Sequence, residues 1–311
     1  MLDHIRPPRR RGPRHLEFSL SLPVFIFLLF ISIPRSDAQI KVIYGTDDRH
    51  ELFEELAPEI RQIADATLAL IPHSELREIE GGVIRIRTEN YGKKYHLCSA
   101  ERFREQGTAA FCSGFLVTPD LVMTAGHCIR NLLDCQETAF VFGFAYSTPL
   151  EKPEHVPRKD VYYCRELLRS MIVSDGIDFA LVRLDRPVTD RTPLRLRLSG
   201  EIKPGEDLIV LGHPAGLPLK IANGAHVREV HPNGYFTANL DTYGGNSGSP
   251  VVNIRTYEVE GILVRGERDY ILTEENGKSC FASFRCTDAG CRGEAVTLIS
   301  EVLKITGLGA D

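Results

Sequence analysis

From residue 66 onward, the chain alternates short apolar runs rich in β-branched residues with turns rich in Gly, Pro, Asn and Asp. Many short strands separated by turn signals are typical of a β-sandwich or a β-barrel. No sequence repeat suggests a solenoid or a propeller. The pattern therefore predicts an all-β protein. The expected strands lie at 66–71, 82–87, 114–118, 139–144, 179–184, 208–212, 226–230, 235–240, 250–254 and 260–266.

Helical spacing of apolar residues occurs in only two segments. In residues 51–64 Pro58 interrupts the spacing, so we expect a broken helix there. Residues 294–305 predict a C-terminal α-helix. A polar, proline-containing stretch from about Arg186 to Pro204 separates two β units of similar size. We expect the two domains to be residues 39–190 and 191–311.

Composition narrows the class of protein. The chain has 311 residues, of which 43% are hydrophobic and 25% charged, and this balance excludes wholesale disorder and fibrous folds. The formal net charge of −5 argues against a nucleic-acid-binding protein, which normally carries a basic surplus.

The first 38 residues have the layout of a secretory signal peptide. A basic segment at 1–17 precedes an apolar run at 18–33, and small residues follow at Ser36 and Ala38. An uncleaved membrane anchor is the alternative, but the run is shorter than the ~20 residues that a span needs. We therefore expect cleavage near Ala38, a secreted or periplasmic protein, and no stable membrane association afterwards.

Eight cysteines follow the predicted signal peptide. An even number in an exported chain favours disulfides over free thiols. A zinc site is the competing interpretation, but no CxxC pair occurs, so we expect no metal site. Eight cysteines allow 105 pairings, and the cysteine positions alone leave the pairing open. The cysteines are Cys98, Cys112, Cys128, Cys135, Cys164, Cys280, Cys286 and Cys291.

Three local patterns carry candidate chemistry. The first pattern covers residues 111–118 and 122–128 and predicts two strands, the second of which ends at His127 directly after small residues. Such neighbours leave room for the imidazole to face a cleft. A lone histidine is more often a hydrogen-bonded structural residue, and we interpret His213, in a separate loop, in that way.

The second pattern is an acid at the start of an apolar run. Asp178 opens the run 178–184, and a carboxylate among apolar neighbours needs a partner for its charge, which an imidazole N–H could supply. The alternatives are that Asp178 only ends a turn, or that Asp175 is the functional acid.

The third pattern is the glycine-rich segment 240–250, which contains Ser247. Glycines allow positive φ and a close approach of the backbone to a ligand. The N–H groups of Gly245 and Ser247 could then point at one spot, as an oxyanion hole requires. A glycine-rich hairpin turn is the alternative.

The three patterns together supply a nucleophilic hydroxyl, a base and an orienting carboxylate. The motifs TAGHC, DFALVRL and GGNSGSP resemble the active-site motifs of the trypsin/chymotrypsin-like serine peptidases. GNSGSP and VIYGTDDRHE are similar to the bacterial V8-like, or glutamyl-endopeptidase-like, branch. The resemblance implies two perpendicular six-stranded β-barrels of the chymotrypsin-like kind.

The resemblance also implies residue roles. His127 would be the general base, Asp178 its orienting acid and Ser247 the nucleophile of a serine endopeptidase. Gly245 and Ser247 would form the oxyanion hole, and Cys112 would pair with Cys128. No cofactor is expected, and the expected partners are polypeptide substrates of a monomeric enzyme.

The predicted substrate pocket contains Asp241, Thr242, Val264, Arg265 and Gly266. In trypsin-like enzymes an acid at the position of Asp241 favours Arg or Lys before the scissile bond. A turn residue bonded to backbone is the alternative, and Arg265 could also neutralise Asp241. The glutamyl branch has a histidine where this chain has Leu263, although Thr242 matches that branch.

Two further expectations concern activation and competing functions. Cleavage after Lys41 would expose Val42, but Asn246 cannot offer the charge that holds a new N-terminus in trypsin-like zymogens, so we expect no such switch. The alternative function is a catalytically inactive binding or adhesion protein on the same scaffold. An HtrA-type protease is disfavoured, because the ~45 residues after Gly266 are too few for a peptide-binding domain.

Overall fold

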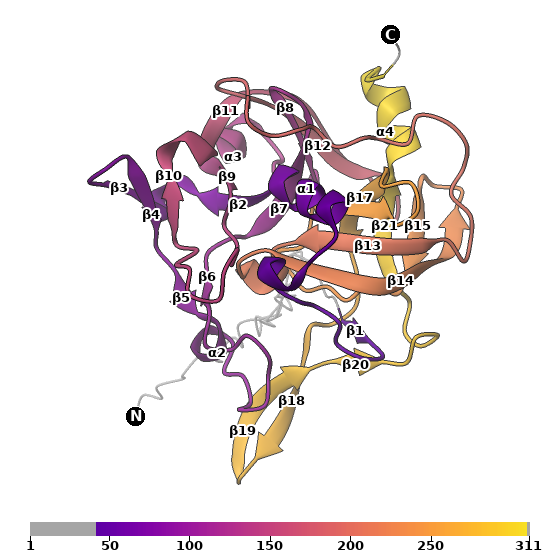
Figure 1. Ribbon diagram of the computed structural model, residues 1–311. Coiled ribbons are helices and arrows are strands. Elements are labelled where there is room, and N and C mark those ends of the chain that lie inside the picture. The colour runs from indigo at the N-terminus through magenta and orange to yellow at the C-terminus, as the bar shows by residue number, and fades with distance from the viewer. Residues whose placement is uncertain (1–41, 310–311) are drawn as a thin grey trace, which may run out of the picture. The chain divides into compact units, whose positions relative to one another are not determined.

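The predicted apolar runs form two β-barrels in the computed structural model, which describes residues 42–309 (Figure 1). The predicted signal peptide lies outside these residues. The first barrel contains β2 (Thr67–Pro72), β7 (Cys112–Thr118), β8 (Leu121–Thr124), β9 (Thr138–Phe142), β11 (Val161–Ile172) and β12 (Asp178–Leu184). The second contains β13 (Asp207–Gly212), β14 (Lys220–His231), β15 (Tyr235–Ala238), β16 (Pro250–Asn253), β17 (Val259–Arg265) and β21 (Glu294–Leu298).

Each barrel is closed. The strand order is β11-β12-β8-β7-β2-β9 in the first and β13-β14-β15-β21-β17-β16 in the second, and all neighbouring strands pair antiparallel. The predicted chymotrypsin-like architecture, with two six-stranded barrels and a C-terminal helix, is confirmed. The domain boundary at 190/191 stays a prediction.

Smaller elements surround the barrels. The additional strands are β1 (Ile43–Tyr44), β3 (Leu76–Ile79), β4 (Val83–Ile86), β5 (Glu89–Asn90), β6 (Gly107–Thr108), β10 (His155–Pro157), β18 (Tyr270–Glu275), β19 (Lys278–Ser283) and β20 (Arg285–Cys286). The α-helices are α1 (Pro58–Ala66), α2 (Tyr91–Lys94), α3 (Leu132–Gln136) and α4 (Ile299–Thr306). Short 3₁₀ turns lie at Leu52–Glu54, His73–Glu75, Arg158–Asp160 and Pro214–Gly216.

Both helix predictions need correction. Pro58 begins α1 instead of interrupting a helix, since proline has no N–H to lose at the first helical position. Residues 294–298 form β21, and α4 begins only at Ile299. The spacing of the apolar residues in 294–298 fits a strand as well as a helix. The segment forms a strand because it pairs with β15 and β17.

The hairpin β18–β19 extends away from the barrels (Figure 1). Its turn is Asn276-Gly277, and both residues have positive φ, at 52° and 73°. An Asn-Gly pair between two β runs is a strong hairpin signal, and the sequence analysis overlooked it. The disulfide between Cys280 and Cys98 ties the hairpin to the rest of the protein.

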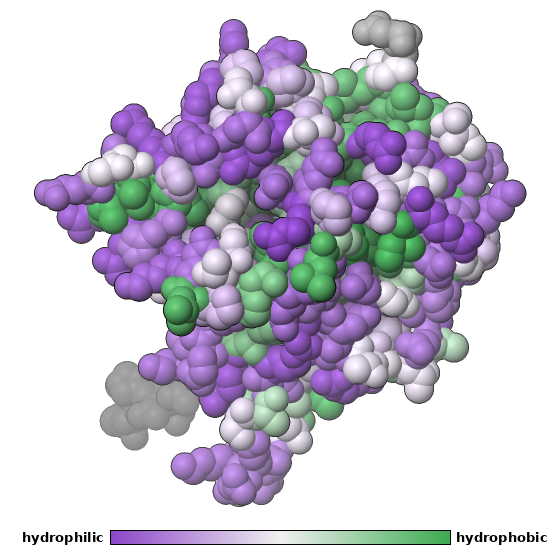
Figure 2. All heavy atoms as spheres, in the orientation of Figure 1, coloured by the Kyte–Doolittle hydropathy of each residue, from purple (hydrophilic) through white to green (hydrophobic). Residues whose placement is uncertain are grey.

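The two barrels pack against each other through apolar side chains. One buried cluster contains Phe115 and Val122 from the first barrel and Ile209, Val252 and Val264 from the second. Loops of both barrels therefore meet beside this shared core. The visible surface is largely hydrophilic, with small separate hydrophobic patches (Figure 2). Within 42–309, none of the helices is sufficiently long and apolar to cross a membrane.

The cysteines form four pairs at bonding distance, as expected for an exported chain. The pairs are Cys98–Cys280, Cys112–Cys128, Cys135–Cys164 and Cys286–Cys291.

Candidate active site

His127 lies in the turn after β8, which ends at Thr124 and not at the histidine as predicted. Gly126 allows this turn to approach β12 closely. A Cβ at Gly126 would lie 2.8 Å from the carbonyl oxygen of Phe179 and 3.1 Å from Oδ1 of Asp178. Only glycine avoids these contacts. Gly126 therefore allows the neighbouring His127 to lie close to Asp178.

The carboxylate of Asp178 holds His127 at two points. The backbone N–H of His127 donates to Oδ1 at 3.1 Å, and Nδ1 of the ring lies 2.7 Å from Oδ2. Asp178 is buried, and the His127 side chain is 13% exposed. With the Nδ1–H directed at a carboxylate, the lone pair of the neutral ring lies on Nε2, where a general base needs it.

Asp178 is in turn held by the second barrel. Its backbone N–H donates to the hydroxyl of Thr297 at 3.0 Å, and that hydroxyl donates to the Asp178 carbonyl oxygen, also at 3.0 Å. Thr297 belongs to β21 and is fully buried. One threonine thus fixes the start of β12 relative to the other barrel.

Arg265 also lies beside Asp178. One guanidinium nitrogen is 4.0 Å from Oδ2 of Asp178, and another donates to the carbonyl oxygen of Gly176 at 2.9 Å. The idea that Arg265 neutralises Asp241 is therefore not supported. Among the described residues, no ion pair joins those two side chains.

Ser247 sits in a loop with two glycines at positive φ, Gly245 at 95° and Gly248 at 89°. The carbonyl oxygen of Ser247 accepts the N–H of Ser113 at 2.8 Å. It also lies 3.7 Å from Sγ of Cys128, the residue that follows His127. The fold therefore brings Ser247 from the second barrel beside the histidine turn of the first.

The loop around Gly245 is fixed from several sides. Its carbonyl oxygen accepts the hydroxyl of Ser113 at 2.8 Å, and a Cβ at this position would lie 2.5 Å from the His213 carbonyl oxygen. The Gly244 N–H donates to Asp269 at 3.1 Å. These contacts hold the backbone around the expected oxyanion hole in one conformation.

The disulfide Cys112–Cys128 lies beside these groups, at the position that the family resemblance implied. His127 and the two sulfur atoms lie within 4.8 Å of one another, which also resembles a metal-ligand cluster. The sulfurs are bonded to each other and so offer no thiolate to a metal. We interpret the cluster as a brace for the histidine turn.

His213 and Asn246 take structural positions. Nδ1 of His213 lies 3.0 Å from the Leu217 carbonyl oxygen, and burial lowers the pKa of this histidine to about 3. The ring is therefore neutral at ordinary pH. The amide oxygen of Asn246 accepts the hydroxyl of Ser249 at 3.3 Å.

Asp241 faces the segment that begins the described chain. Its carboxylate accepts the N–H of Tyr44 at 2.6 Å and that of Asp48 at 3.3 Å. Burial raises the pKa of the Asp241 carboxyl; the Tyr44 bond opposes that shift, and the negative charge of Asp48 adds to it. These contacts match the alternative in which Asp241 is a turn residue bonded to backbone.

The same N-terminal segment is packed against the serine loop elsewhere. Val42 is fully buried, and its carbonyl oxygen accepts the N–H of Thr242 at 3.3 Å. The guanidinium of Arg49 lies over the Tyr243 ring, 4.4 Å from its centre. Lys41, after which cleavage was considered, lies outside the described residues.

Glu294 is a candidate pocket residue that the sequence analysis missed. Its Oε2 accepts the hydroxyl of Thr242 at 2.8 Å, and its Oε1 accepts the N–H of Glu267 at 3.3 Å. A Cβ at Gly266 would overlap this carboxylate. Glu294 therefore lies against two members of the predicted pocket, and it is fully buried. The sequence did contain a signal for this residue, since Glu294 is an acid at the start of a strand-like run. We expected that segment to be helical.

Comparison with known proteins identifies the class of domain. Residues 112–262 match the family model described as "Trypsin-like peptidase domain". This stretch of the chain is therefore similar to a trypsin-like peptidase domain, and the matched range includes His127, Asp178 and Ser247.

Two further similarities are more distant. The chain is 32% identical over 155 residues to secreted RxLR effector protein 73 of Plasmopara viticola, an alignment that covers 46% of this chain and 38% of that relative's length. Among solved structures, it is similar to Rv3671c of M. tuberculosis H37Rv, a serine-to-alanine mutant in an inactive form. That match has a TM-score of 0.44 and 13% identity, and covers 86% of this chain and 97% of the other.

Proposed function

We propose that this protein is a serine endopeptidase that hydrolyses peptide bonds through an acyl-enzyme intermediate. The observation that carries the proposal is the double contact of His127 with the buried Asp178, beside a loop that presents Ser247. Ser247 would attack the peptide carbonyl while Nε2 of His127 takes its proton. The N–H groups of Gly245 and Ser247 would stabilise the oxyanion, and water would then release the acyl group.

We also propose that the enzyme prefers Arg or Lys before the scissile bond. The sequence assigned this preference to Asp241, within a pocket that also includes Thr242, Val264, Arg265 and Gly266. The structural contacts favour Glu294 as the acid that reads the basic side chain, since its carboxylate lies against Thr242 and Gly266. Asp241 instead holds two backbone N–H groups, and its raised pKa weakens its negative charge.

The protein is further proposed to act outside the cytoplasm as a monomer on polypeptide substrates, with residues 1–38 removed. The four disulfides support an oxidising compartment, and the similar protein from Plasmopara viticola is a secreted effector. The V8-like branch stays a proposal that rests on the GNSGSP and VIYGTDDRHE motifs.

Covalent labelling tests the proposed chemistry. The secreted protein should react with a fluorophosphonate probe, and peptide mapping should place the label on Ser247. Ser247→Ala should abolish labelling and lower kcat by roughly 10⁶-fold while leaving the unfolding transition unchanged. Folded wild-type protein that neither reacts nor cleaves a peptide library would support the alternative, an inactive binding protein.

A peptide library in which the residue before the scissile bond is varied through all amino acids then tests the preference for Arg and Lys. Glu294→Gln should reduce cleavage after Arg and Lys far more than cleavage after uncharged residues. Asp241→Asn is the matched control, because it removes the other buried carboxyl nearby. If Asp241→Asn loses more of the preference for Arg and Lys than Glu294→Gln does, Asp241 and not Glu294 reads the basic side chain.

A further inference from the structure

Arg265 brings a positive charge from the second barrel to the acid of the proposed triad. It is the last residue of β17, and one of its guanidinium nitrogens lies 4.0 Å from Oδ2 of Asp178. Oδ2 is also the oxygen that lies 2.7 Å from Nδ1 of His127. The guanidinium and the imidazole therefore approach the same carboxylate oxygen, so the charge of Asp178 is shared between two partners.

Two further contacts hold the guanidinium of Arg265 in place. Its Nη2 donates to the carbonyl oxygen of Gly176 at 2.9 Å, in the turn that leads into β12. The guanidinium carbon lies 5.7 Å from the centre of the Tyr235 ring, within the range of a cation–π contact. The side chain is 29% exposed, so water screens its charge incompletely.

Other charged groups near the pair are exposed or bound elsewhere. Among the described residues, His127 and Arg265 are the basic side chains within 4.0 Å of the Asp178 carboxylate. The titratable side chains on the elements packed around the pair are Arg169 on β11, Asp175 before β12, His231 on β14, Tyr235 on β15 and Glu294 on β21. The arginine and the aspartate of this set are exposed, and the histidine and tyrosine rings stack on each other. The glutamate is bound to Thr242.

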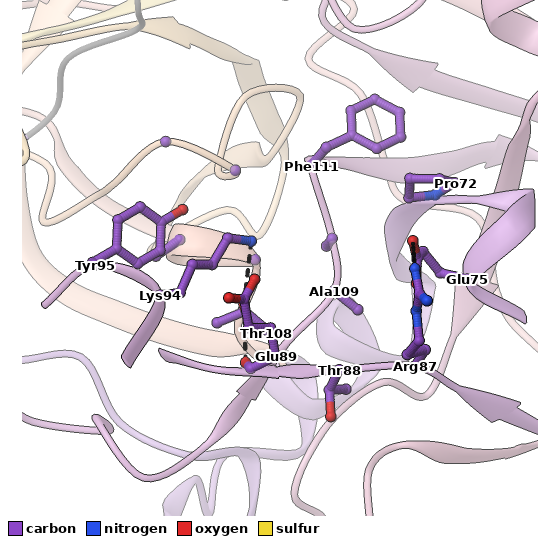
Figure 3. Close-up of a pocket in the computed structure, with 15 residues that line it drawn as sticks. Pro72, Glu75, Arg87, Thr88, Glu89, Lys94, Tyr95, Thr108, Ala109 and Phe111 are labelled. Carbon is purple, nitrogen blue, oxygen red and sulfur yellow. Dashed lines mark hydrogen bonds and ion pairs between the residues drawn. The ribbon is translucent and has the colours of Figure 1, made fainter. Parts of the chain in front are cut away.

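Two more cations lie beside the serine loop, in a cavity of about 660 Å³ that Gly245 helps to line (Figure 3). Figure 3 shows Arg87 against Glu75, to which two hydrogen bonds join it, and Lys94 beside Thr108. Within residues 42–309, neither cation forms an ion pair with the acid of the triad. The cation that acts directly on that acid is therefore Arg265.

A fixed positive charge at this place changes how the carboxylate acts on His127. A carboxylate alone favours a protonated imidazole beside it. The charge of Arg265 offsets part of that effect and repels a second positive charge on the ring. A general base must be neutral before it can accept a proton, so this repulsion preserves the base as the pH falls.

We propose that Arg265 is a positioning residue that acts through Asp178 to keep His127 neutral in mildly acidic medium, so that the peptidase works below neutral pH. The inference rests on the proposed endopeptidase function. The two nitrogens that approach Oδ2 are no more than ~7 Å apart, and at an effective dielectric constant of roughly 40–80 the repulsion of two unit charges corresponds to ~0.5–1 pH unit. Removing the charge should therefore confine activity to higher pH.

The test follows the rate at which a fluorophosphonate labels Ser247 from about pH 4.5 to about pH 8. Labelling needs the base but no bound peptide, so contacts between Arg265 and a substrate do not affect it. The wild-type rate should rise with pH to a plateau. Arg265→Gln should raise the midpoint of this rise by roughly 0.5–1 pH unit, because glutamine keeps a donor for Gly176 without the charge. Arg265→Lys should stay close to the wild-type midpoint, because it keeps a cation.

Arg183→Gln is the matched control, because it removes the same charge from the strand that carries Asp178. Arg183 has a 35% exposed side chain near the far end of β12, ~16 Å along the strand from Asp178. That separation exceeds the Debye length, so the control should leave the midpoint unchanged.

Equal midpoints for the wild type and Arg265→Gln would overturn the inference, even if the plateau changed, since a merely structural role alters the rate at every pH. Equal shifts in Arg265→Gln and Arg265→Lys would also overturn it, because the effect would then not come from the charge. Folded wild-type protein that takes no label at any pH would instead overturn the proposed function.

Discussion

The hydroxyl of Thr297 offers the sharpest test of how the two barrels cooperate. Thr297→Val keeps the shape of the side chain but removes both hydrogen bonds to the Asp178 backbone, at 3.0 Å each. Both residues are buried, so the Asp178 N–H would lose its partner without gaining water. An unsatisfied buried polar group costs about 1–3 kcal/mol of folding free energy.

The same change should also affect activity, since Thr297 positions Asp178 without touching substrate. A shift of Asp178 would move both contacts that it makes with His127, and a misplacement of ~1 Å costs about 10²-fold in rate. We therefore expect kcat/KM for an Arg-containing peptide to fall by roughly 10- to 100-fold, mainly through kcat.

Thr297→Ser is the matched variant, because it keeps the hydroxyl and removes only a methyl group, worth roughly 1 kcal/mol. Urea unfolding and steady-state kinetics should be measured for the wild type and both variants. Serine should retain most of the activity that valine loses. Equal kcat values for Thr297→Val and Thr297→Ser would refute the argument that this hydroxyl positions the acid.

Three other outcomes follow from the structure. Gly126→Ala should lower kcat/KM by roughly 10²-fold, because its Cβ would push the His127 turn away from β12; unchanged kinetics would contradict this. His213 has a folded pKa of about 3 against 6.5 when unfolded, so the unfolded state binds more protons between these values and stability falls as the pH falls. Between pH 6.5 and 5.5 the wild type should lose about 1 kcal/mol more unfolding free energy than His213→Gln, measured in urea, and equal losses would count against a neutral buried ring. Replacing Cys98 and Cys280 together by serine should lower the unfolding free energy by about 2–4 kcal/mol in the same assay, whereas an unchanged midpoint would mean that the hairpin adds nothing.

Local patterning was sufficient for most strands of the barrels. Each of the ten expected runs forms a strand within a few residues, because most of these strands are buried along nearly their whole length and so appear in the sequence as short apolar runs. β11 escaped detection because it is long and partly exposed, so polar residues interrupt its apolar ones, and its pairing with β12 has two shifts. The hairpin β18–β19 was missed although Asn276-Gly277 signalled it.

The sequence by itself determined the strand pattern, the even set of cysteines that favours disulfides, and the three motifs that contain His127, Asp178 and Ser247. These are local properties, encoded by neighbouring residues. Tertiary structure decided where each buried charge finds its partner. Glu294 meets Thr242, which lies 52 positions away, and Asp241 meets Tyr44 across 197 positions. A carboxylate is stabilised by whichever donors the folded chain brings within about 3 Å, and no local pattern specifies those donors.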